Sequence, residues 1–280
     1  MTQIKLSVII PVLNEEFHLK RLLPKIKKYF FEIIVIDSDS KDNTKKIVKK
    51  NKCRYFNKKF KNFSEKINFG INKSNLQWVF ELHADEILEK NFFFKLKKIF
   101  KKQKNFNSIS LIRNLKYKNK LIKHGGVFPQ RQIRIWKKQF GFYNEKQVTD
   151  EYVTIRQKKL LISNLNIIDD NIAFTDLYFL KKHIIYAKRE AKYYESFLIN
   201  RLKQNKIFKD KKLNEKILYY KFPILIRPFL LFLYRYFYKK GFLDGYYGFE
   251  YCLFQTLFYR LMVDVFILKK KLMNLIIEIF

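Results

Sequence analysis

The chain has 280 residues, of which 48% are apolar, 30% charged and 18% aromatic. This composition indicates a packed globular protein and excludes a disordered chain, and the two cysteines, Cys53 and Cys252, exclude a disulfide framework or a cysteine-based zinc site. The net charge of +34 favours an anionic partner, which is nucleic acid, a membrane surface or a phosphorylated substrate. Because Lys outnumbers Arg 48 to 11, whereas bidentate phosphate recognition favours Arg, the charge alone does not choose among these partners.

Segments with strand and helix patterns alternate along the first 115 residues. Continuous apolar runs predict strands buried on both faces, and apolar residues at helical spacing predict helices. The predicted strands are Lys5–Val12, Glu32–Ile36, Arg54–Phe56, Trp78–Leu82 and Ser108–Arg113, and the predicted helices are Leu19–Ile26, Asp42–Lys50, Ser64–Lys73 and Glu89–Lys102. This alternation predicts parallel β-α-β units and an open sheet covered by helices on both faces.

The pattern changes after residue 115. The segment Lys116–Glu151 is irregular and contains the Gly-Gly pair Gly125 and Gly126. Beyond Asp176 the apolar residues recur at threes and fours, which predicts helices. The last part, Phe222–Phe280, is rich in aromatic and aliphatic residues and is interrupted by Lys and Arg.

No segment has the uninterrupted apolar length of a membrane span. The longest uncharged apolar stretches near the C-terminus are Pro228–Tyr234 and Tyr251–Tyr259, and both are shorter than the roughly 18–20 residues that a spanning helix needs. The residues after Met1 lead directly into an apolar strand pattern, without the regions of a signal peptide. We therefore expect a cytoplasmic protein without a membrane-spanning segment.

Three acidic clusters interrupt this basic chain, and each follows a predicted strand: Asn14–Glu16, Asp37–Asp39 and Asp85–Glu86. Open α/β sheets bind ligands beyond the carboxyl ends of their strands, and carboxylates placed there suit Mg²⁺ or Mn²⁺ held together with substrate phosphates. The alternative is that these short acidic side chains cap the helices that follow. The sequence lacks the Gly-x-x-x-x-Gly-Lys-Ser/Thr loop of the common NTPases and a Gly-x-Gly-x-x-Gly turn after the first strand, which argues against both nucleotide-binding classes.

The acidic clusters lie within three longer motifs that resemble the family 2 glycosyltransferases of GT-A fold. The motifs are Ser7–Glu15 (SVIIPVLNE), Val35–Thr44 (VIDSDSKDNT) and Trp78–Glu86 (WVFELHADE). Four later segments resemble the branch of that family that builds the inner core of lipopolysaccharide and includes a β-glucosyltransferase acting on heptose. These segments are His124–Pro129, Gln132–Trp136, Val148–Asp150 and Gly241–Gly245. The resemblance spans nearly the whole chain and implies a nucleotide-sugar-binding α/β fold, an open and mostly parallel sheet flanked by helices.

The resemblance also implies a role for each matching residue. On the donor side, Pro11 and Glu15 flank the base and ribose, and Asp37 binds the uracil. Lys66 supplies a cation near the nucleotide. Asp85 holds Mg²⁺ or Mn²⁺ against the diphosphate, with Glu86 as a second candidate. Arg134 contacts the diphosphate or the acceptor, and Asp150 is the general base. An inverting transfer needs such a carboxylate to take the proton of the acceptor hydroxyl.

The sequence departs from the family pattern at two positions. His83 stands where the family has its first signature Asp, and as a donor-side residue it either bonds a ribose hydroxyl or ligates the metal. The segment Val148–Asp150 ends in Thr-Asp where the branch has His-Glu, so Asp150 is favoured as the base and the adjacent Glu151 is the alternative. His124 lies beside the glycine pair and is a weaker candidate for an acceptor contact.

These inferences predict a GT-A domain at residues 1–170, with a nucleotide-sugar half at 1–103 and an acceptor half at 104–170. Residues 171–280 form a helical region that lies on an anionic membrane surface, unless it is an ordinary helical layer or a dimer interface. The predicted function is an inverting, metal-dependent transfer of glucose from UDP-glucose to a lipid-linked saccharide of the lipopolysaccharide or lipooligosaccharide core, at the inner face of the cytoplasmic membrane.

Three other functions compete with this prediction. The first is a glycosyltransferase with the same donor chemistry but another acceptor: an exopolysaccharide, a capsule or a polyprenyl-linked glycan. His83 leaves open a catalytically weak, glycosyltransferase-like scaffold. A nucleic-acid-binding protein is suggested by the charge alone, but the sequence has no nucleic-acid-binding motif and that class leaves the acidic clusters unexplained.

Overall fold

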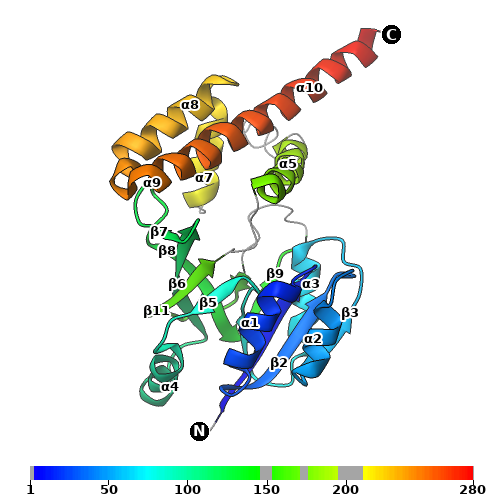
Figure 1. Ribbon diagram of the computed structural model, residues 1–280, viewed down its shortest axis with the longest axis vertical. Coiled ribbons are helices and arrows are strands. Elements are labelled where there is room, and N and C mark those ends of the chain that lie inside the picture. The colour runs from blue at the N-terminus through cyan, green and yellow to red at the C-terminus, as the bar shows by residue number, and fades with distance from the viewer. Residues whose placement is uncertain (1–2, 146–152, 171–175, 195–210, 280) are drawn as a thin grey trace. The chain divides into compact units, whose positions relative to one another are not determined.

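The computed structural model describes residues 3–145, 153–170, 176–194 and 211–279 (Figure 1). The chain divides into two compact units. The first unit, here called the sheet unit, comprises Met1–Leu121 and Pro129–Ala173, and the second, the helical unit, comprises Ile122–Phe128 and Phe174–Phe280. The segment Ile122–Phe128 therefore groups with the helices, although it lies far from them in the sequence.

A mixed nine-stranded sheet forms the sheet unit. In its first half, four parallel strands follow the order β3-β2-β1-β4; they are β1 (Ile4–Val12), β2 (Phe30–Asp37), β3 (Arg54–Asn57) and β4 (Trp78–Glu81). The order then continues β8-β6-β11-β5, with β7 paired to β6; these strands are β5 (Glu86–Leu88), β6 (Ser108–Tyr117), β7 (Lys120–Ile122), β8 (Gln130–Lys137) and β11 (Leu160–Asp170). A small separate sheet pairs β9 (Gly141–Tyr143) with β10 (Val153–Ile155).

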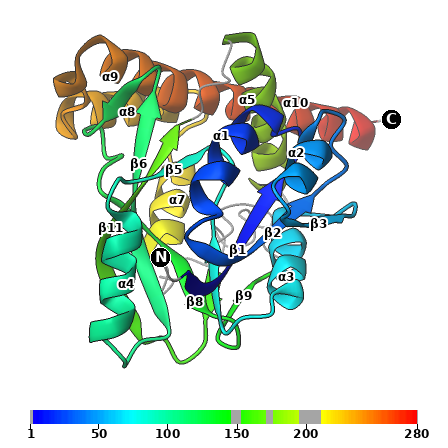
Figure 2. The ribbon, with the colours of Figure 1, turned by 60° about the horizontal axis from the view of Figure 1, so that its bottom comes forward.

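Helices cover both faces of the parallel half. They are α1 (Glu16–Ile26), α2 (Thr44–Lys50), α3 (Phe63–Lys73) and α4 (Phe92–Lys102). Side chains of α1, α2 and α4 share one apolar core with the sheet, and side chains of α3 belong to a second core. Figure 2 shows the backbones of these helices beside the strands of the sheet unit. Along β1, Val8 and Ile10 lie in the first core and Ile9 in the second. This alternation is why the strand needs a continuous apolar run.

Glycine permits the closest approach between α3 and the sheet. A Cβ atom at Gly70 would lie 2.6 Å from Cγ2 of Ile9 and 3.2 Å from Cγ1 of Ile36. Any larger residue would push α3 away from the carboxyl ends of β1 and β2.

The predicted α/β fold is confirmed, but the described part of the segment Lys116–Glu151, residues 116–145, is not irregular. It contains the end of β6 and the strands β7, β8 and β9. Its centre was missed because β8 buries the charged Arg134 beside Ile135 and Trp136, which breaks the apolar pattern. The short strand β5 was also missed, and α4 begins at Phe92 instead of Glu89.

The helical unit contains five described α-helices. They are α5 (Asp176–Tyr193), α7 (Lys211–Lys221), α8 (Ile226–Leu233), α9 (Gly245–Cys252) and α10 (Tyr259–Ile279), with π-helical turns at Tyr234–Tyr238 and Leu253–Phe258 and a 3₁₀ turn at Gly241–Asp244. Residues of α5, α7 and α10 form its apolar core. Two buried carboxylates are neutralised within this unit: Asp264 accepts from Arg227 Nε at 2.9 Å, and Glu190 accepts from Arg260 at 2.7 Å.

The stretch Gly241–Met273 is continuously helical. By length and composition alone it is apolar enough to cross a membrane, with a mean hydropathy of 1.4 and only 28% of the relevant window buried. The expectation that no segment has these properties is therefore wrong, because it considered only uninterrupted apolar runs. Core helices of water-soluble proteins pass the same test, so this observation does not by itself assign a membrane span.

Candidate functional site

The carboxyl ends of β1 and β2 meet at one edge of the sheet, where Asp37 is fully buried. The backbone N–H and the hydroxyl of Ser40 donate to Asp37 Oδ1 at 3.0 and 2.6 Å. The hydroxyl of Tyr55 donates to Oδ2 at 2.7 Å, and burial together with this bond raises the pKa of Tyr55. The Asp37 carboxylate is thus held in one orientation by groups from its own loop and from β3.

The loops after β1 and β2 are fastened to each other. The Asn14 N–H donates to Ser40 Oγ at 2.8 Å, and the Glu16 N–H donates to Asp42 Oδ2 at 2.9 Å. Glu16 in return accepts from the Asn43 N–H at 2.8 Å, which lowers the pKa of Glu16. Glu16 and Asp42 therefore stabilise helix starts, as the capping alternative predicts for short acidic side chains.

Lys66 of α3 brings a buried cation to the same edge. Its Nζ donates to the Val12 carbonyl at 2.7 Å, and only 7% of the residue is exposed. Burial lowers the pKa of Lys66 to about 8, although Asp37 and Glu15 act in the opposite direction. Glu15 itself lies 2.6 Å from His18 Nδ1. The structure thus brings together Glu15, Asp37 and Lys66, and places Pro11 one residue before the carbonyl that Lys66 binds.

A second cluster lies after β4 and is organised around Arg134 of β8. The guanidinium donates to Glu81 Oε1 at 2.6 Å and to Glu86 Oε1 at 2.9 Å. Tyr143 donates to the other oxygen of Glu81. Burial alone would raise the pKa of Glu81, but Arg134 and His83 outweigh it and hold that pKa at about 2.

His83 lies at the edge of this cluster, with 32% of its side chain exposed. Its Nε2 is 2.9 Å from Glu81 Oε1 and 3.0 Å from Arg134 Nη1. Burial and Arg134 lower the pKa of His83, but Glu86 and Glu81 together outweigh them and raise it. Since arginine has no acceptor atom, the proton on Nε2 is donated to Glu81, and Nδ1 is the ring nitrogen that remains for a ligand.

Arg134 and Glu86, both expected to contact the ligand or the metal, are bonded to each other in the structure. Arg134 is 5% exposed and Glu86 is 1% exposed. Both Glu86 oxygens are bonded, one to Arg134 and the other to the His83 N–H at 2.8 Å. The two side chains form a buried ion pair, so a role in binding a diphosphate or a metal ion would require this pair to open.

Two carboxylates that the sequence interpretation did not single out lie near Asp85. The Asp170 N–H donates to the Asp85 carbonyl at 3.0 Å. Burial raises the pKa of Asp169 to about 6; Arg113 opposes this rise, and the negative charges of Asp85 and Glu86 add to it. The pair ends β11, so an acidic doublet at the end of a strand was the available signal. It was missed because β11 was not recognised.

The described residues near Asp85 could hold a divalent cation only together with water and substrate phosphates. In the described ranges, no three His, Cys, Asp or Glu side chains are grouped to enclose a metal ion. Mg²⁺, however, is usually held by one or two carboxylates together with water and substrate phosphates. The half-buried Asp85, with the Asp169 charge close by, matches that type of site.

The two candidates for the general base cannot be placed. Asp150 and Glu151 lie within residues 146–152, outside the part of the chain that the structure describes. Their role stays a prediction.

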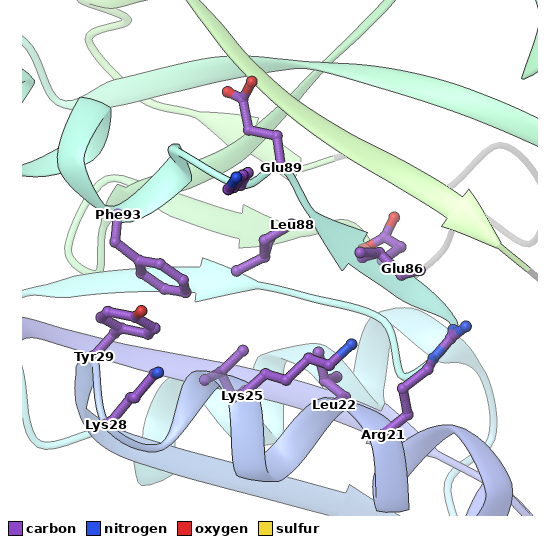
Figure 3. Close-up of a pocket in the computed structure, with 12 residues that line it drawn as sticks. Arg21, Leu22, Lys25, Lys28, Tyr29, Glu86, Leu88, Glu89 and Phe93 are labelled. Carbon is purple, nitrogen blue, oxygen red and sulfur yellow. The ribbon is translucent and has the colours of Figure 1, made fainter.

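A pocket lies between α1 and the segment from β5 to α4 (Figure 3). It is lined by apolar and aromatic groups, with the basic side chains Arg21 and Lys25 from α1 and Lys28 from the segment that follows α1 (Figure 3). Its lining includes Glu86 but none of Asp37, Lys66 and Asp85. The strand-end clusters, and not this pocket, therefore hold the groups suited to a nucleotide diphosphate.

A parallel half-sheet in the order β3-β2-β1-β4, a continuation with mixed strand directions and acidic residues at the strand ends define the GT-A type of glycosyltransferase fold. Residues 7–170, more than half of the chain, match the model of glycosyl transferase family 2. The chain belongs to this family and is a glycosyltransferase.

Known structures resemble the chain only in part. Two are of glucosyl-3-phosphoglycerate synthase from Mycobacterium tuberculosis, one with Mn²⁺, UDP and glucosyl-3-phosphoglycerate and one with Mn²⁺, UDP-glucose and phosphoglyceric acid. For the first of these, the sequence identity is 19% and the TM-score is 0.35. The matched region is 39% of this chain and 44% of that enzyme. A third, described as a mycobacterial protein, is 18% identical with a TM-score of 0.36, over 40% of this chain and 41% of that one. The chain thus spans less than half the length of these proteins, and likeness at this level carries no argument about substrates. No curated protein matches the sequence.

Proposed function

We propose that the protein is an inverting, metal-dependent glycosyltransferase that moves glucose from UDP-glucose to a lipid-linked saccharide of the lipopolysaccharide or lipooligosaccharide core. The observation that carries the proposal is that Asp37 and Lys66 lie together at the carboxyl ends of β1 and β2, and that Asp85 follows the neighbouring parallel strand β4, in a family 2 chain. Ligands bind at this edge in open α/β sheets.

The resemblance assigns Asp37 to the uracil base. Its carboxylate is fixed by Ser40 and Tyr55 and is fully buried, so a base N–H would reach it by replacing one of these neutral donors. Pro11 and Glu15 flank the base and ribose in this proposal. His83 offers Nδ1 to a ribose hydroxyl or to the metal.

The diphosphate requires positive charge. Lys66 places an ammonium beside the Val12 carbonyl in a largely buried setting, where an ionic interaction is stronger than in water. Asp85 would hold Mg²⁺ or Mn²⁺, and the nearby Asp169, which is paired with Arg113, adds negative charge beside it. The bound cation would neutralise charge on the departing diphosphate.

The transfer itself needs a base on the acceptor side. The acceptor hydroxyl gives its proton to Asp150, or to Glu151 in the alternative assignment, and its oxygen bonds to the anomeric carbon. The bond from that carbon to the phosphate oxygen breaks, and its electron pair leaves with the nucleoside diphosphate. Lys66 stabilises this leaving charge most strongly in the transition state.

The exterior of the helical unit favours a lipid-linked acceptor. Large apolar side chains of α8, the turns after it and α9 are exposed: Phe229, Leu230, Leu233, Tyr234, Phe237, Tyr238, Phe242, Leu243, Tyr246 and Phe249. Exposed Lys239 and Lys240 lie within the same stretch. Aromatic residues interleaved with Lys are suited to the headgroup region of an anionic membrane, so we place the protein at the inner face of the cytoplasmic membrane.

Three acceptors other than a lipopolysaccharide core fit the same donor site: an exopolysaccharide, a capsule and a polyprenyl-linked glycan. The alternative of a catalytically weak scaffold was motivated by His83 alone, and family membership favours the enzyme.

A thermal-shift screen of nucleotide sugars with and without Mn²⁺ tests the donor assignment. We expect UDP-glucose with Mn²⁺ to raise the Tm more than GDP- or CMP-sugars do, since ligand binding to the folded state adds stability. Transfer of radiolabelled glucose to deacylated lipooligosaccharide then tests the acceptor. An equal response to all nucleotide sugars, unchanged by Mn²⁺, would overturn the proposed donor site.

A further inference from the structure

Two motifs that the donor site does not use contact each other within the helical unit. They are the segment that begins at His124 and the turn Gly241–Gly245, about 120 residues apart in the sequence. His124 Nδ1 lies 2.9 Å from Asp244 Oδ1. The backbone N–H groups of Lys123 and His124 donate to Asp244 Oδ2 at 2.9 and 2.7 Å.

Glycines hold the backbone on both sides of this contact. Gly125 and Gly126 have φ of +69° and +73°, a conformation that residues with a Cβ atom rarely adopt. The Gly125 N–H donates to the Lys239 carbonyl at 2.9 Å. A Cβ atom at Gly248 would lie 2.3 Å from the carbonyl oxygen of Gly241, so the turn that carries Asp244 is fixed against α9.

The contact determines which nitrogen of His124 carries the proton. An ionised carboxylate only accepts hydrogen bonds, so Nδ1 donates its proton to Asp244 and the lone pair of the neutral ring is on Nε2. Asp244 has 8% of its side chain exposed, whereas His124 has 38% exposed. The carboxylate is therefore inside the unit, and the imidazole extends toward solvent.

Two backbone donors already hold the Asp244 carboxylate in the loop. The imidazole adds a third donor and at the same time presents an oriented acceptor atom on the exposed side of the contact. A neutral Nε2 binds O–H groups and not anions, and the ligand rich in O–H groups in the proposed reaction is the saccharide acceptor.

We propose that Nε2 of His124 accepts a hydrogen bond from a hydroxyl of the saccharide acceptor, and that Asp244 is a positioning residue that sets the tautomer of His124. This inference rests on the proposed function and extends it to an acceptor contact on the helical unit. The binding step transfers no proton.

The test compares two substitutions that separate the two ring nitrogens. In His124→Asn the amide N–H replaces Nδ1–H toward Asp244, and nothing replaces Nε2. In His124→Gln the amide oxygen reaches the position of Nε2. With deacylated lipooligosaccharide as acceptor, we expect the Asn variant to raise the acceptor KM about five- to tenfold, the loss typical of one hydrogen bond. The Gln variant should recover part of that loss, and the KM for UDP-glucose and the Tm should stay unchanged in both.

A spectroscopic measurement on the wild-type chain gives an independent readout. Two-bond ¹H–¹⁵N spectra of ¹⁵N-histidine-labelled protein should assign the Nδ1–H tautomer to His124, and deacylated lipooligosaccharide should shift its Nε2 resonance. Asp244→Asn should abolish the single tautomer and weaken acceptor binding.

Three outcomes would overturn the inference, and a fourth would overturn the donor assignment instead. A His124→Asn variant with a wild-type acceptor KM, whatever its Tm, reduces the contact to a structural support of the loop. An Nε2 resonance that moves with inorganic phosphate and not with the saccharide assigns an anion instead. If the wild-type enzyme hydrolyses UDP-glucose but glycosylates no saccharide, the acceptor part of the proposed function fails; if it does not bind UDP-glucose at all, the donor part fails.

Discussion

Asp37 of the sheet unit and Asp264 of the helical unit are both fully buried but are held in different ways. Asp37 is oriented by hydrogen bonds from neutral groups, Ser40 and Tyr55, with the Lys66 charge nearby. Asp264 accepts directly from the buried Arg227. A carboxylate in direct contact with its counter-charge contributes to stability, whereas the groups that donate to Asp37 are neutral. Glu86 of the sheet unit is paired as Asp264 is, which is why its neighbour Asp85 is the better metal candidate.

The largest expected effect separates Asp85 from a structural carboxylate. Asp85→Asn should lower glucose transfer on the order of 10³-fold, since the leaving diphosphate loses its metal-bound charge partner. The Tm should change little. Steady-state kinetics at saturating Mn²⁺ measure the loss, and the exposed Glu215→Gln is the control. Full activity of the Asp85 variant would refute the metal assignment.

The second prediction concerns stability in the helical unit. Asp264→Ala leaves Arg227, 1% exposed, without its carboxylate, and should destabilise the fold by about 3–5 kcal/mol. Urea unfolding measures the difference. The double variant Arg227→Met with Asp264→Leu should recover most of it, because removing both charges is far less costly than removing one. A single variant as stable as wild type would show that the pair is not needed.

The third prediction uses the pKa of Lys66. Because that pKa is lowered to about 8, the ammonium is charged below pH 8 and is lost as the pH rises above it. The affinity for UDP should therefore fall between about pH 8 and 9, up to tenfold per pH unit. Calorimetric titrations from pH 7 to 9 measure it. Lys66→Met should bind weakly at all these pH values; an equal pH dependence in that variant would assign the effect to another group.

The smallest expected effect contrasts the exteriors of the two units. Phe237→Ser, at a residue 58% exposed in the helical unit, should weaken binding to vesicles that contain anionic lipid, whereas Phe31→Ser, 63% exposed in the sheet unit, should not. Lys239→Ala should reduce binding about fivefold at low salt, near 1 kcal/mol. Vesicle flotation measures both. If all variants bind vesicles equally, these exposed residues do not form a membrane-binding surface. If Phe237→Ser dissociates a dimer, they form a dimer interface instead.

The sequence was most informative where burial is local and continuous. The core of β1 and β2 is apolar on both faces, so Lys5–Val12 and Glu32–Ile36 were predicted to within two residues of the observed strands. Each of the predicted residues Glu15, Asp37, Lys66 and Asp85 follows a strand or lies on a helix that this pattern identifies.

The sequence was least informative where partners are distant. Arg134 is inside the sheet because Glu81 and Glu86, about 50 residues earlier, neutralise it, and no local pattern contains that pairing. Asp169 reaches the neighbourhood of Asp85 only through the antiparallel pairing of β11 with β5. The contact between His124 and Asp244 likewise joins motifs from two ends of the unit.

The cluster around Arg134 also restricts which residues can occupy position 83. Glu81 and Glu86 contribute two negative charges; Arg134 pairs with both, and Arg113 Nε lies 3.9 Å from Glu86. His83 adds a further hydrogen-bond donor at Glu81. An aspartate at position 83 would instead place a third carboxylate beside Glu81 and would remove that donor. Position 83 is therefore electrostatically coupled to position 81, and the histidine at the signature position matches the acid at position 81.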